Sequence, residues 1–197
     1  MGKMALQKDS HYTYADYLNG PEDERWEIID GRAYAMVPPS PTHQAVLRQL
    51  TLKIGNYLED KTCELYFAPF AVRFPEKNER DEDITTVVEP DLLVICDNSK
   101  IDEKGLKGAP DFIIEILSPS TAGYDMIQKR RLYERHGVRE YWLVDPTNRT
   151  VMVYALKEKN KYGEPEIYGS EDEIKVHLFD DLVLNMKEVF GPARKEP

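Results

Sequence analysis

Two acidic residues lie within or directly beside apolar runs, where carboxylates are uncommon. Glu115 lies inside the apolar run of residues 112–117, and Asp91 opens a second apolar run directly after Pro90. Runs of this kind, bounded by turn residues, are typical of strands that are covered on both faces. Because an ionised carboxylate costs several kcal/mol to bury without a partner, Glu115 must be paired, hydrogen-bonded or bound to a metal. Neighbouring strands would bring Asp91 to the same side of a sheet.

Together the two carboxylates would form a site for a hard cation. Carboxylate and carbonyl oxygens suit Mg²⁺ or Mn²⁺ rather than zinc, and the main-chain carbonyl of Ile116 is the natural third ligand. Residue 117 shares the strand face of Glu115, and a lysine there would complete the pattern Asp, then Glu, any residue, Lys. Residue 117 is a leucine, but Lys129 in the next helical segment is able to look back toward the sheet. We infer that the lysine has migrated to this helix.

The elements that must position these residues alternate along the chain. We expect a short helix at 13–19, a long amphipathic helix at 42–60 and a second long helix within 118–138. Hairpins are expected at 25–37, with an Asp-Gly turn, and at 139–156. Further strands are expected within 64–74, 90–97 and 111–117, with short ones near 166–168, 173–178 and 182–184. This mixture predicts an α/β fold with a central mixed β-sheet flanked by helices. The strands at 90–97 and 111–117 should lie in the middle of the sheet.

The second long helix carries its own signals. Capping Ser and Thr residues precede it at positions 118–121, and Gly137 ends it. We expect Ile127, Leu132 and Tyr133 on its inner face.

Composition sets the broad class of the protein. A chain of 197 residues with 41% hydrophobic and 31% charged residues is ordinary for a soluble globular protein, and we expect one domain over residues 1–197. We expect no apolar window long enough for a membrane span and no signal-peptide core, and hence a cytoplasmic location. Cys63 and Cys96 are most simply reduced thiols in or near the core.

The net charge of -10 argues against general affinity for a polyanion. A nucleic-acid interface would therefore need a local basic surface. The second long helix offers one, and a preceding loop could extend it. The basic residues concerned are Lys129, Arg130, Arg131, Arg135 and Arg139, with Lys100, Lys104 and Lys107 on the loop.

The blocks "EPDLLVICD", "PDFIIEILSPST", "QKRRLYERHGV" and "REYWLVDP" occur in this order. Together they resemble the Uma2 family, also called DUF820, of the restriction-endonuclease-like PD-(D/E)XK superfamily. The resemblance runs from about residue 12 to residue 156, and it implies a restriction-endonuclease-like core followed by a C-terminal β extension over about 157–190. It assigns Asp91 and Glu115 to the metal and Lys129 to the migrated lysine position. It also draws in Glu27, as a catalytic acid that would bind a second metal or a bridging water, and His43.

The activity implied is that of a metal-dependent endonuclease acting on DNA. Mg²⁺ or Mn²⁺ held by Asp91 and Glu115 would lower the pKa of a bound water, and Lys129 would orient that water or neutralise charge on the phosphate. Substrate contacts would come from His43 and from three arginines of the helix, Arg130, Arg131 and Arg135. A homodimer is expected, because cleaving both strands of a duplex suits a two-fold pair of sites, and the aromatic-rich hairpin at 139–156 would supply the interface.

Plainer interpretations stay open for each residue. Glu115 and Lys129 would also suit a buried structural ion pair, and Asp91 alone a turn residue at the start of a strand. Glu27 would suit a polar face of its strand. His43 would suit the start of a helix or the core, and the arginines a solvated helix face. For the whole chain, the alternatives are a catalytically silent nucleic-acid-binding or assembly module of the same fold and a metal-dependent hydrolase with a substrate other than DNA.

Overall fold

The computed structural model describes residues 10–20, 25–119, 122–157 and 160–192. The chain forms two compact units, each built from three segments. The first contains Met1–Pro38, Ala68–Pro90 and Ser99–Ala109, and the second contains Pro39–Phe67, Asp91–Asn98 and Pro110–Pro197. The single domain expected from the sequence stays a prediction beside this division.

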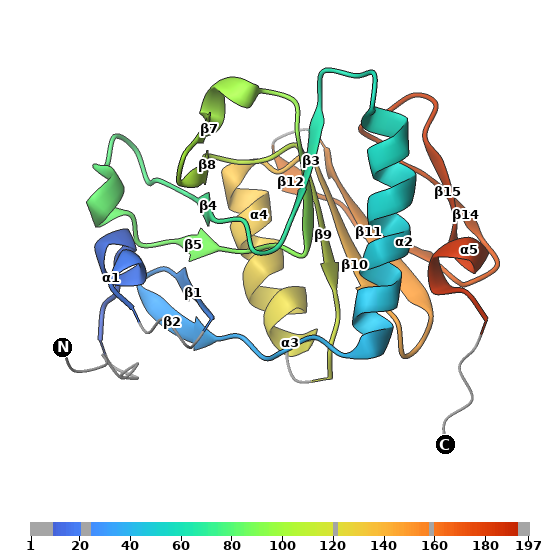
Figure 1. Ribbon diagram of the computed structural model, residues 1–197, viewed down its shortest axis with the longest axis horizontal. Helices are drawn as coiled ribbons and strands as arrows, with labels where there is room; N and C mark the ends of the chain where they lie inside the picture. The colour runs from blue at the N-terminus through green and yellow to red at the C-terminus, as the bar shows by residue number, and fades with distance from the viewer. Residues whose placement is uncertain (1–9, 21–24, 120–121, 158–159, 193–197) are drawn as a thin grey trace. The chain divides into compact units, whose positions relative to one another are not determined.

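The first unit is built on a sheet whose described strands follow the order β2-β1-β5-β4-β8-β7 (Figure 1). These strands are β1 Trp26–Ile29, β2 Arg32–Ala35, β4 Val72–Arg73, β5 Val87–Val88, β7 Ile101–Asp102 and β8 Gly105–Lys107. The predicted Asp-Gly turn joins β1 to β2, and both of its residues have positive φ, 50° at Asp30 and 76° at Gly31. Turns with two such residues match the twist of a hairpin. The short helix α1, Tyr14–Leu18, follows Thr13, whose N–H donates to the Asp16 carboxylate at 2.9 Å.

The second unit contains the larger sheet, with described strands in the order β12-β11-β10-β9-β6-β3 and β13 beside β11. These strands are β3 Glu64–Phe67, β6 Leu92–Ile95, β9 Phe112–Ile116, β10 Glu140–Asp145, β11 Thr150–Lys157, β12 Lys161–Tyr162 and β13 Glu166–Tyr168. Neighbours run antiparallel except β9 and β10, which are parallel, so the sheet is mixed as predicted. Strand β6, which begins directly after Asp91, and strand β9, which contains Glu115, lie side by side inside the sheet.

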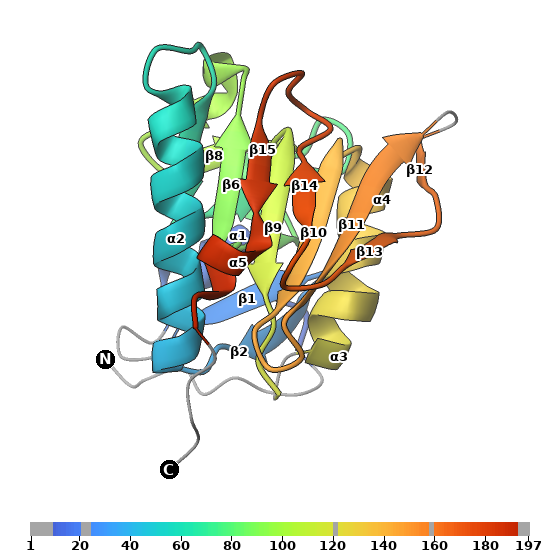
Figure 2. The same ribbon diagram turned by 90° about the vertical axis from the view of Figure 1, so that its right-hand side faces the viewer.

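Helices cover both faces of this sheet (Figure 2). Helix α2, Pro41–Leu58, packs Val46, Leu50 and Ile54 onto one face, and the Ser40 hydroxyl caps it by accepting from the N–H of His43 at 3.1 Å. The C-terminal elements β14 Glu173–Lys175, β15 Val183–Asn185 and α5 Met186–Phe190 join the same apolar core.

The opposite face carries a helical segment with a wide turn in its middle. Helix α3, Ala122–Tyr124, leads into a π-helical turn, Asp125–Lys129, which continues as α4, Arg130–His136. Gly137 ends α4 in the left-handed conformation, with φ 79°, as its position predicted. The expected capping residues Ser120 and Thr121 lie outside the described residues.

One prediction for this helix is wrong. Ile127 is 49% exposed, whereas Leu132 and Tyr133 are buried as expected. The positions of the π-helical turn that face the sheet are Asp125 and Lys129, at 4% and 3% exposure, because they lie two and one four-residue steps before Tyr133, respectively. The inner face of the turn is therefore charged, and its two apolar side chains, Met126 and Ile127, are exposed.

The aromatic side chains of the hairpin proposed as a dimer interface pack inside the second unit. Tyr141 and Trp142 have no exposed surface, and Tyr154 is only 9% exposed. The rings of Tyr141 and Tyr154 stack with centroids 6.1 Å apart, and Trp142 packs edge-on against Phe112 at 5.3 Å. These aromatic side chains fill the core of the second unit, so they do not form the exposed interface that we expected.

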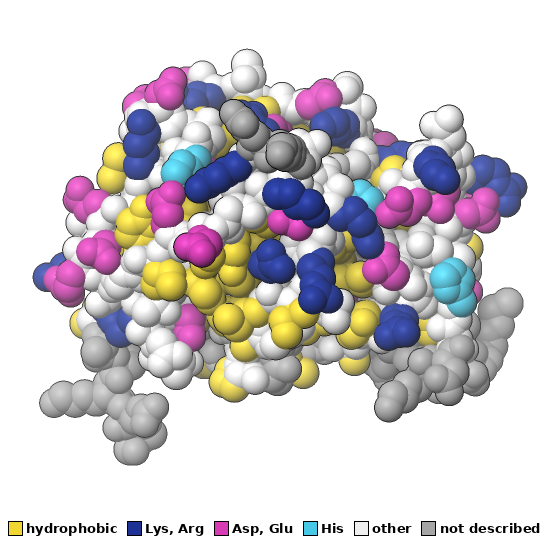
Figure 3. All heavy atoms as spheres, turned by 180° about the vertical axis from the view of Figure 1, so that it is seen from behind, with side chains coloured by type: hydrophobic (Ala, Val, Ile, Leu, Met, Phe, Trp, Pro, Cys, Tyr) yellow, Lys and Arg dark blue, Asp and Glu magenta, His cyan; other side chains and the backbone are white. Residues whose placement is uncertain are grey.

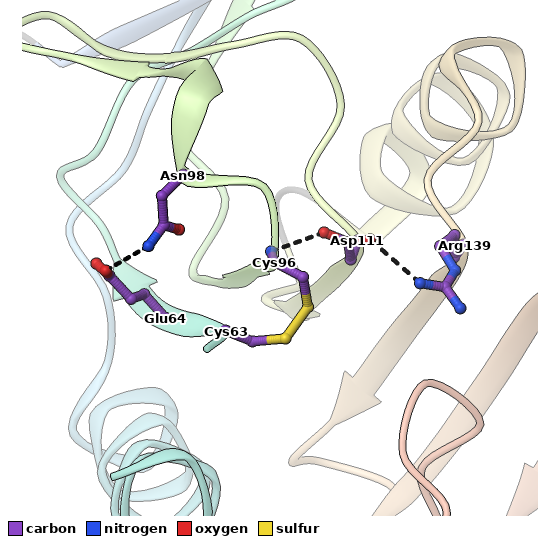
Figure 4. Close-up of a disulfide and its surroundings, with 6 residues drawn as sticks. All are labelled: Cys63, Glu64, Cys96, Asn98, Asp111 and Arg139. Carbon is purple, nitrogen blue, oxygen red and sulfur yellow. Dashed lines mark hydrogen bonds and ion pairs between the residues drawn. A yellow bond between two sulfur atoms is a disulfide. The ribbon is translucent and has the colours of Figure 1, made fainter. Parts of the chain in front are cut away.

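The two cysteines are not reduced thiols as predicted. Cys63 and Cys96 form a disulfide between β3 and β6 (Figure 4). The strand register explains the pairing, because Glu64 lies opposite Ile95 and one further step places Cys63 opposite Cys96. The Asp111 carboxylate accepts from the N–H of Cys96 at 2.8 Å and fixes the end of the strand.

Among the described residues, no helix combines the length and the apolar character that crossing a bilayer would require.

Candidate active site

Strand register brings Asp91 and Glu115 together in the second unit. Leu92 of β6 lies opposite Ile114 of β9, and the next step of this antiparallel ladder sets Asp91 opposite Glu115. Residues opposite each other in such a ladder project from the same face. The N–H of Asp91 lies 3.5 Å from Oε2 of Glu115. The two carboxylates predicted as a pair are therefore neighbours on one face of the sheet.

Asp91 is held by one oxygen. Its Oδ2 accepts from the N–H of Ile116 at 2.8 Å and lies 3.1 Å from Nε2 of His43. An ionised carboxylate only accepts hydrogen bonds, so Nε2 of His43 is the donor in this contact. Within the described part of the chain Oδ1 of Asp91 accepts no hydrogen bond, and the side chain is 19% exposed. Asp91 thus keeps one oxygen available to a ligand.

His43 reaches Asp91 from the first turn of α2. Its side chain is only 9% exposed, and its Nδ1 has no hydrogen-bond partner among the described residues. The contact with Asp91 goes beyond the interpretations of His43 as a helix-start or core residue. It makes His43 a support for a carboxylate of the site.

Glu115 finds its partners on the helical segment. Its Oε1 accepts from Nζ of Lys129 at 2.9 Å and from the hydroxyl of Tyr133 at 2.7 Å. All three residues are at most 3% exposed. Leu117, at the position where the common pattern has its lysine, is buried and donates its N–H to the carbonyl of Val144. The structure therefore brings Lys129 to Glu115 from the helix, and its part as the migrated catalytic lysine stays a prediction.

Asp125 and Tyr133 belong to this cluster, although the sequence argument did not count them among its site residues. Asp125 is 4% exposed, and its Oδ1 lies 3.7 Å from Nζ of Lys129. Positions 125, 129 and 133 are spaced by four residues, so they form one stripe along the helical segment. That spacing, with two opposite charges and a tyrosine, is the signal that would have found them.

The π-helical turn is tied to the sheet by Tyr141. The hydroxyl of this tyrosine donates to the main-chain carbonyl of Asp125 at 3.2 Å. Burial, followed by the charges of Glu115 and Asp125, raises the pKa of Tyr141 well above its ordinary value, so its hydroxyl stays protonated and remains a donor. Turns of this kind recur at functional sites, and here the turn directs both of its charged residues inward.

The basic surface differs from the predicted one in one member. Lys129 is buried against Glu115 and contributes nothing to the surface. Arg131 and Arg135 are exposed, whereas Arg130 is half-buried with its guanidinium 5.8 Å from the centre of the Tyr154 ring. The exposed Arg139 lies 3.3 Å from the Asp111 carboxylate. Lysine and arginine side chains gather near the middle of this side of the molecule, beside apolar side chains (Figure 3).

The lysines expected to extend this surface belong to the first unit. Lys100 and Lys104 are exposed, and Lys107 is half-buried in an ion pair with Asp81. Arg73, which has no exposed surface, shares the same carboxylate. The ion pair compensates the charge of Lys107, and a role for these lysines in binding stays a prediction.

Glu27 also lies in the first unit. It is 2% exposed within β1, all of whose residues are buried, so the interpretation as a solvent-facing residue is wrong. Its Oε1 accepts from the N–H of Glu89 at 2.8 Å. Glu89 in turn accepts from the hydroxyl of Tyr17 at 2.6 Å and pairs with Arg25. A part for Glu27 in metal binding stays a prediction.

The donor set near Asp91 suits a hard divalent cation. It consists of the carboxylate oxygens of Asp91 and Glu115, and Oδ1 of Asp91 accepts no hydrogen bond from the described residues. In the described residues, no group of three or more His, Cys, Asp or Glu side chains could hold a metal ion. Mg²⁺ is commonly bound by only one or two carboxylates, with water and substrate phosphates completing its shell. The residues present therefore fit Mg²⁺ or Mn²⁺, whose shell is completed by water and substrate, better than a metal ion that takes all of its ligands from the protein.

The chain is similar to several known proteins. The sequence profile of the Uma2 family, described as "Putative restriction endonuclease", matches residues 13–187. Two uncharacterized proteins of Synechocystis sp. are similar: slr1290 is 29% identical over 76% of this chain and 75% of its own length, and sll1609 is 25% identical over 82% and 90%.

A solved structure shares the fold. The crystal structure described as a putative nuclease belonging to DUF820 from Anabaena variabilis superposes with a TM-score of 0.72. It is 24% identical in sequence, and the match covers 91% of this chain and 97% of that one. The mixed α/β architecture is thus that of a DUF820 protein. Since the family profile spans most of the chain, the protein belongs to the Uma2 family of restriction-endonuclease-like proteins.

Proposed function

We propose that the protein is a Mg²⁺- or Mn²⁺-dependent endonuclease that hydrolyses phosphodiester bonds of DNA. The observation that carries the proposal is the cluster of Asp91, Glu115 and Lys129, in which the two acidic residues are neighbours on one face of the sheet and the ammonium lies 2.9 Å from Glu115. Metal-dependent phosphodiester hydrolysis uses a metal-activated water and positive charge near the phosphate, and this cluster offers two carboxylates for the metal and a lysine for the charge. Membership of a nuclease family supports the same conclusion.

Each residue of the cluster has a distinct task in this proposal. Asp91 and Glu115, with the carbonyl of Ile116, would hold the metal, and a bound divalent ion would supply a water of lowered pKa and stabilise negative charge on the phosphate. Lys129 orients the attacking water or neutralises the charge that develops on the phosphate. His43 and the N–H of Ile116 fix Oδ2 of Asp91, so that Oδ1 keeps a constant direction. Glu27 is the candidate ligand for a second metal.

Binding of nucleic acid is assigned to the exposed arginines of α4. Arg131 and Arg135 are exposed on the helix whose preceding turn carries Lys129, and Arg130 lies between them and the turn. Contacts of arginine with phosphates would offset the net charge of -10 locally and would weaken as salt rises. Sequence-specific contacts are not part of the proposal.

A substrate panel tests this function. Labelled duplex DNA, single-stranded DNA and RNA are incubated with the protein in Mg²⁺, in Mn²⁺ and in chelator at low salt. Metal-dependent cleavage of DNA that is absent from the same preparation of Glu115→Gln supports the proposal. Cleavage of RNA alone would mean that the substrate is RNA and not DNA. Absence of all cleavage would favour the catalytically silent nucleic-acid-binding or assembly module.

Location and assembly remain further proposals. We place the protein in the cytoplasm, where disulfides are rare, so the thiol state of Cys63 and Cys96 in cells tests the location. A homodimer would suit cleavage of both strands of a duplex, and light scattering that gives a monomeric mass would contradict it.

A further inference from the structure

One oxygen of Glu115 is already occupied by a cation. Lys129 and Tyr133 both donate to Oε1, and the lysine side chain is only 4% exposed. A divalent ion on the same carboxylate would place two positive charges close together in a buried site, where their repulsion is far stronger than in water. Lys129 and the metal therefore compete for Glu115.

Asp125 gives the displaced ammonium a second partner. Its Oδ1 lies 3.7 Å from Nζ of Lys129, which is longer than a hydrogen bond but within the range of an ion pair. Closing this distance to a charge-assisted hydrogen bond requires a movement of about 1 Å. The lysine can thus turn from Glu115 to Asp125 without leaving the buried site.

Asp125 is held in place for this task by its main chain. The hydroxyl of Tyr141 donates to the carbonyl of Asp125, and Tyr141 itself has no exposed surface. Asp125 and Lys129 are the buried positions of the π-helical turn, four residues apart. A buried carboxylate whose main chain is held by Tyr141, 3.7 Å from the ammonium of a long lysine side chain, is the arrangement expected of a receiving partner.

We propose that Lys129 is an internal cation that occupies Glu115 in the metal-free protein, and that Asp125 takes over its ammonium when a divalent ion binds. Asp125 is then a positioning residue that sets metal affinity through Lys129. This inference rests on the proposed metal-dependent function. It adds to that function a Lys129 side chain that pairs with Glu115 in one state and with Asp125 in the other. It also gives a role to Asp125, which does not contact the metal.

A double-mutant cycle on Mn²⁺ affinity tests the inference. Calorimetric titration with Mn²⁺ compares wild type, Lys129→Met, Asp125→Asn and the double variant, and Glu115→Gln serves as the blank. Removing the competitor in Lys129→Met should tighten binding about tenfold, and removing the receiving partner in Asp125→Asn should weaken it by a similar factor, as is typical of contacting charged groups. In the Lys129→Met background the effect of Asp125→Asn should vanish.

The outcomes separate this inference from the proposed function. If wild type binds Mn²⁺ but Asp125→Asn weakens binding equally in both backgrounds, Asp125 acts directly on the metal and the inference alone fails. If neither wild type nor Lys129→Met binds Mn²⁺, the metal-dependent function fails and takes the inference with it. Circular dichroism confirms folding before each titration. Should Asp125→Asn not fold, Lys129→Met decides, because unchanged or weaker Mn²⁺ binding in that variant contradicts the competition.

Discussion

Replacing Lys129 by methionine should destabilise the protein strongly in the absence of divalent metal. The side chains of Lys129 and Glu115 are both only 4% exposed, so the substitution leaves Glu115 and Asp125 buried without the lysine that lies between them. Breaking a buried ion pair on one side typically costs about 3–5 kcal/mol. For a chain of this length each kcal/mol lowers Tm by roughly 2–4 °C, so we expect a fall of about 6–20 °C.

Glu115→Gln should cost less than Lys129→Met. It leaves the ammonium of Lys129 with the Asp125 carboxylate, 3.7 Å away, and retains a hydrogen-bonding side chain for Tyr133. The expected order of stability is therefore wild type, then Glu115→Gln, then Lys129→Met. Thermal unfolding followed by circular dichroism in chelator at neutral pH measures this order.

An exposed ion pair supplies the matched control. Lys187 pairs with Glu171 at 2.9 Å, the same distance as in the buried pair, but the two side chains are 69% and 71% exposed. Exposed pairs contribute about 0–1 kcal/mol, so Lys187→Met should change Tm by no more than a few degrees. If Lys129→Met loses no more stability than Lys187→Met, the description of a buried charged cluster is wrong.

Three further predictions follow from single features. His43→Leu should weaken Mn²⁺ binding by roughly 10- to 100-fold in calorimetry, and His43→Gln should recover part of this loss by donating to Asp91. Burial raises the pKa of Glu140, so the folded protein binds the carboxyl proton of Glu140 more tightly than the unfolded chain does. Urea unfolding should therefore show the free energy of unfolding falling as pH rises from the ordinary carboxyl pKa through the raised pKa of Glu140. The variant in which Cys63 and Cys96 are both serine should lose about 2–4 kcal/mol in urea unfolding, and reduced wild type should match it.

Each of these predictions has an outcome that contradicts it. Equal Mn²⁺ affinity in His43→Leu and wild type would remove His43 from the support of Asp91. A pH dependence that persists unchanged in Glu140→Gln would assign the effect to another group. Unfolding of wild type that does not respond to reductant would show that the disulfide adds nothing to stability.

The central strands and their carboxylates could be predicted from the sequence because local patterns determine them. Continuous apolar runs bounded by turn residues mark β6 and β9, and the cost of burying Glu115 called for a partner. Lys129 was found because its position relative to Tyr133 places both on the face that looks toward the sheet. In these cases the pattern of a few neighbouring residues carries the whole argument.

The features that were missed depend on contacts between distant segments or on geometry without a sequence mark. The Cys63–Cys96 disulfide follows from the pairing of β3 with β6, and the sequence separation of 33 residues gives no sign of that register. The π-helical turn has no proline or glycine to announce it, so the outward direction of Ile127 could not be foreseen. The first unit gathers one sheet from three separate segments, which local patterns do not reveal.

The most direct test of the account is the nicking of supercoiled plasmid by wild type and Asp91→Asn in Mg²⁺ or Mn²⁺ at low salt. Asp60→Asn, a change of the same kind at an exposed position after α2, is the matched control, and chelator is the blank. Removing a catalytic metal ligand should abolish detectable nicking in Asp91→Asn and leave Asp60→Asn like wild type. Equal nicking by Asp91→Asn and wild type would show that Asp91 and Glu115 do not form the active site.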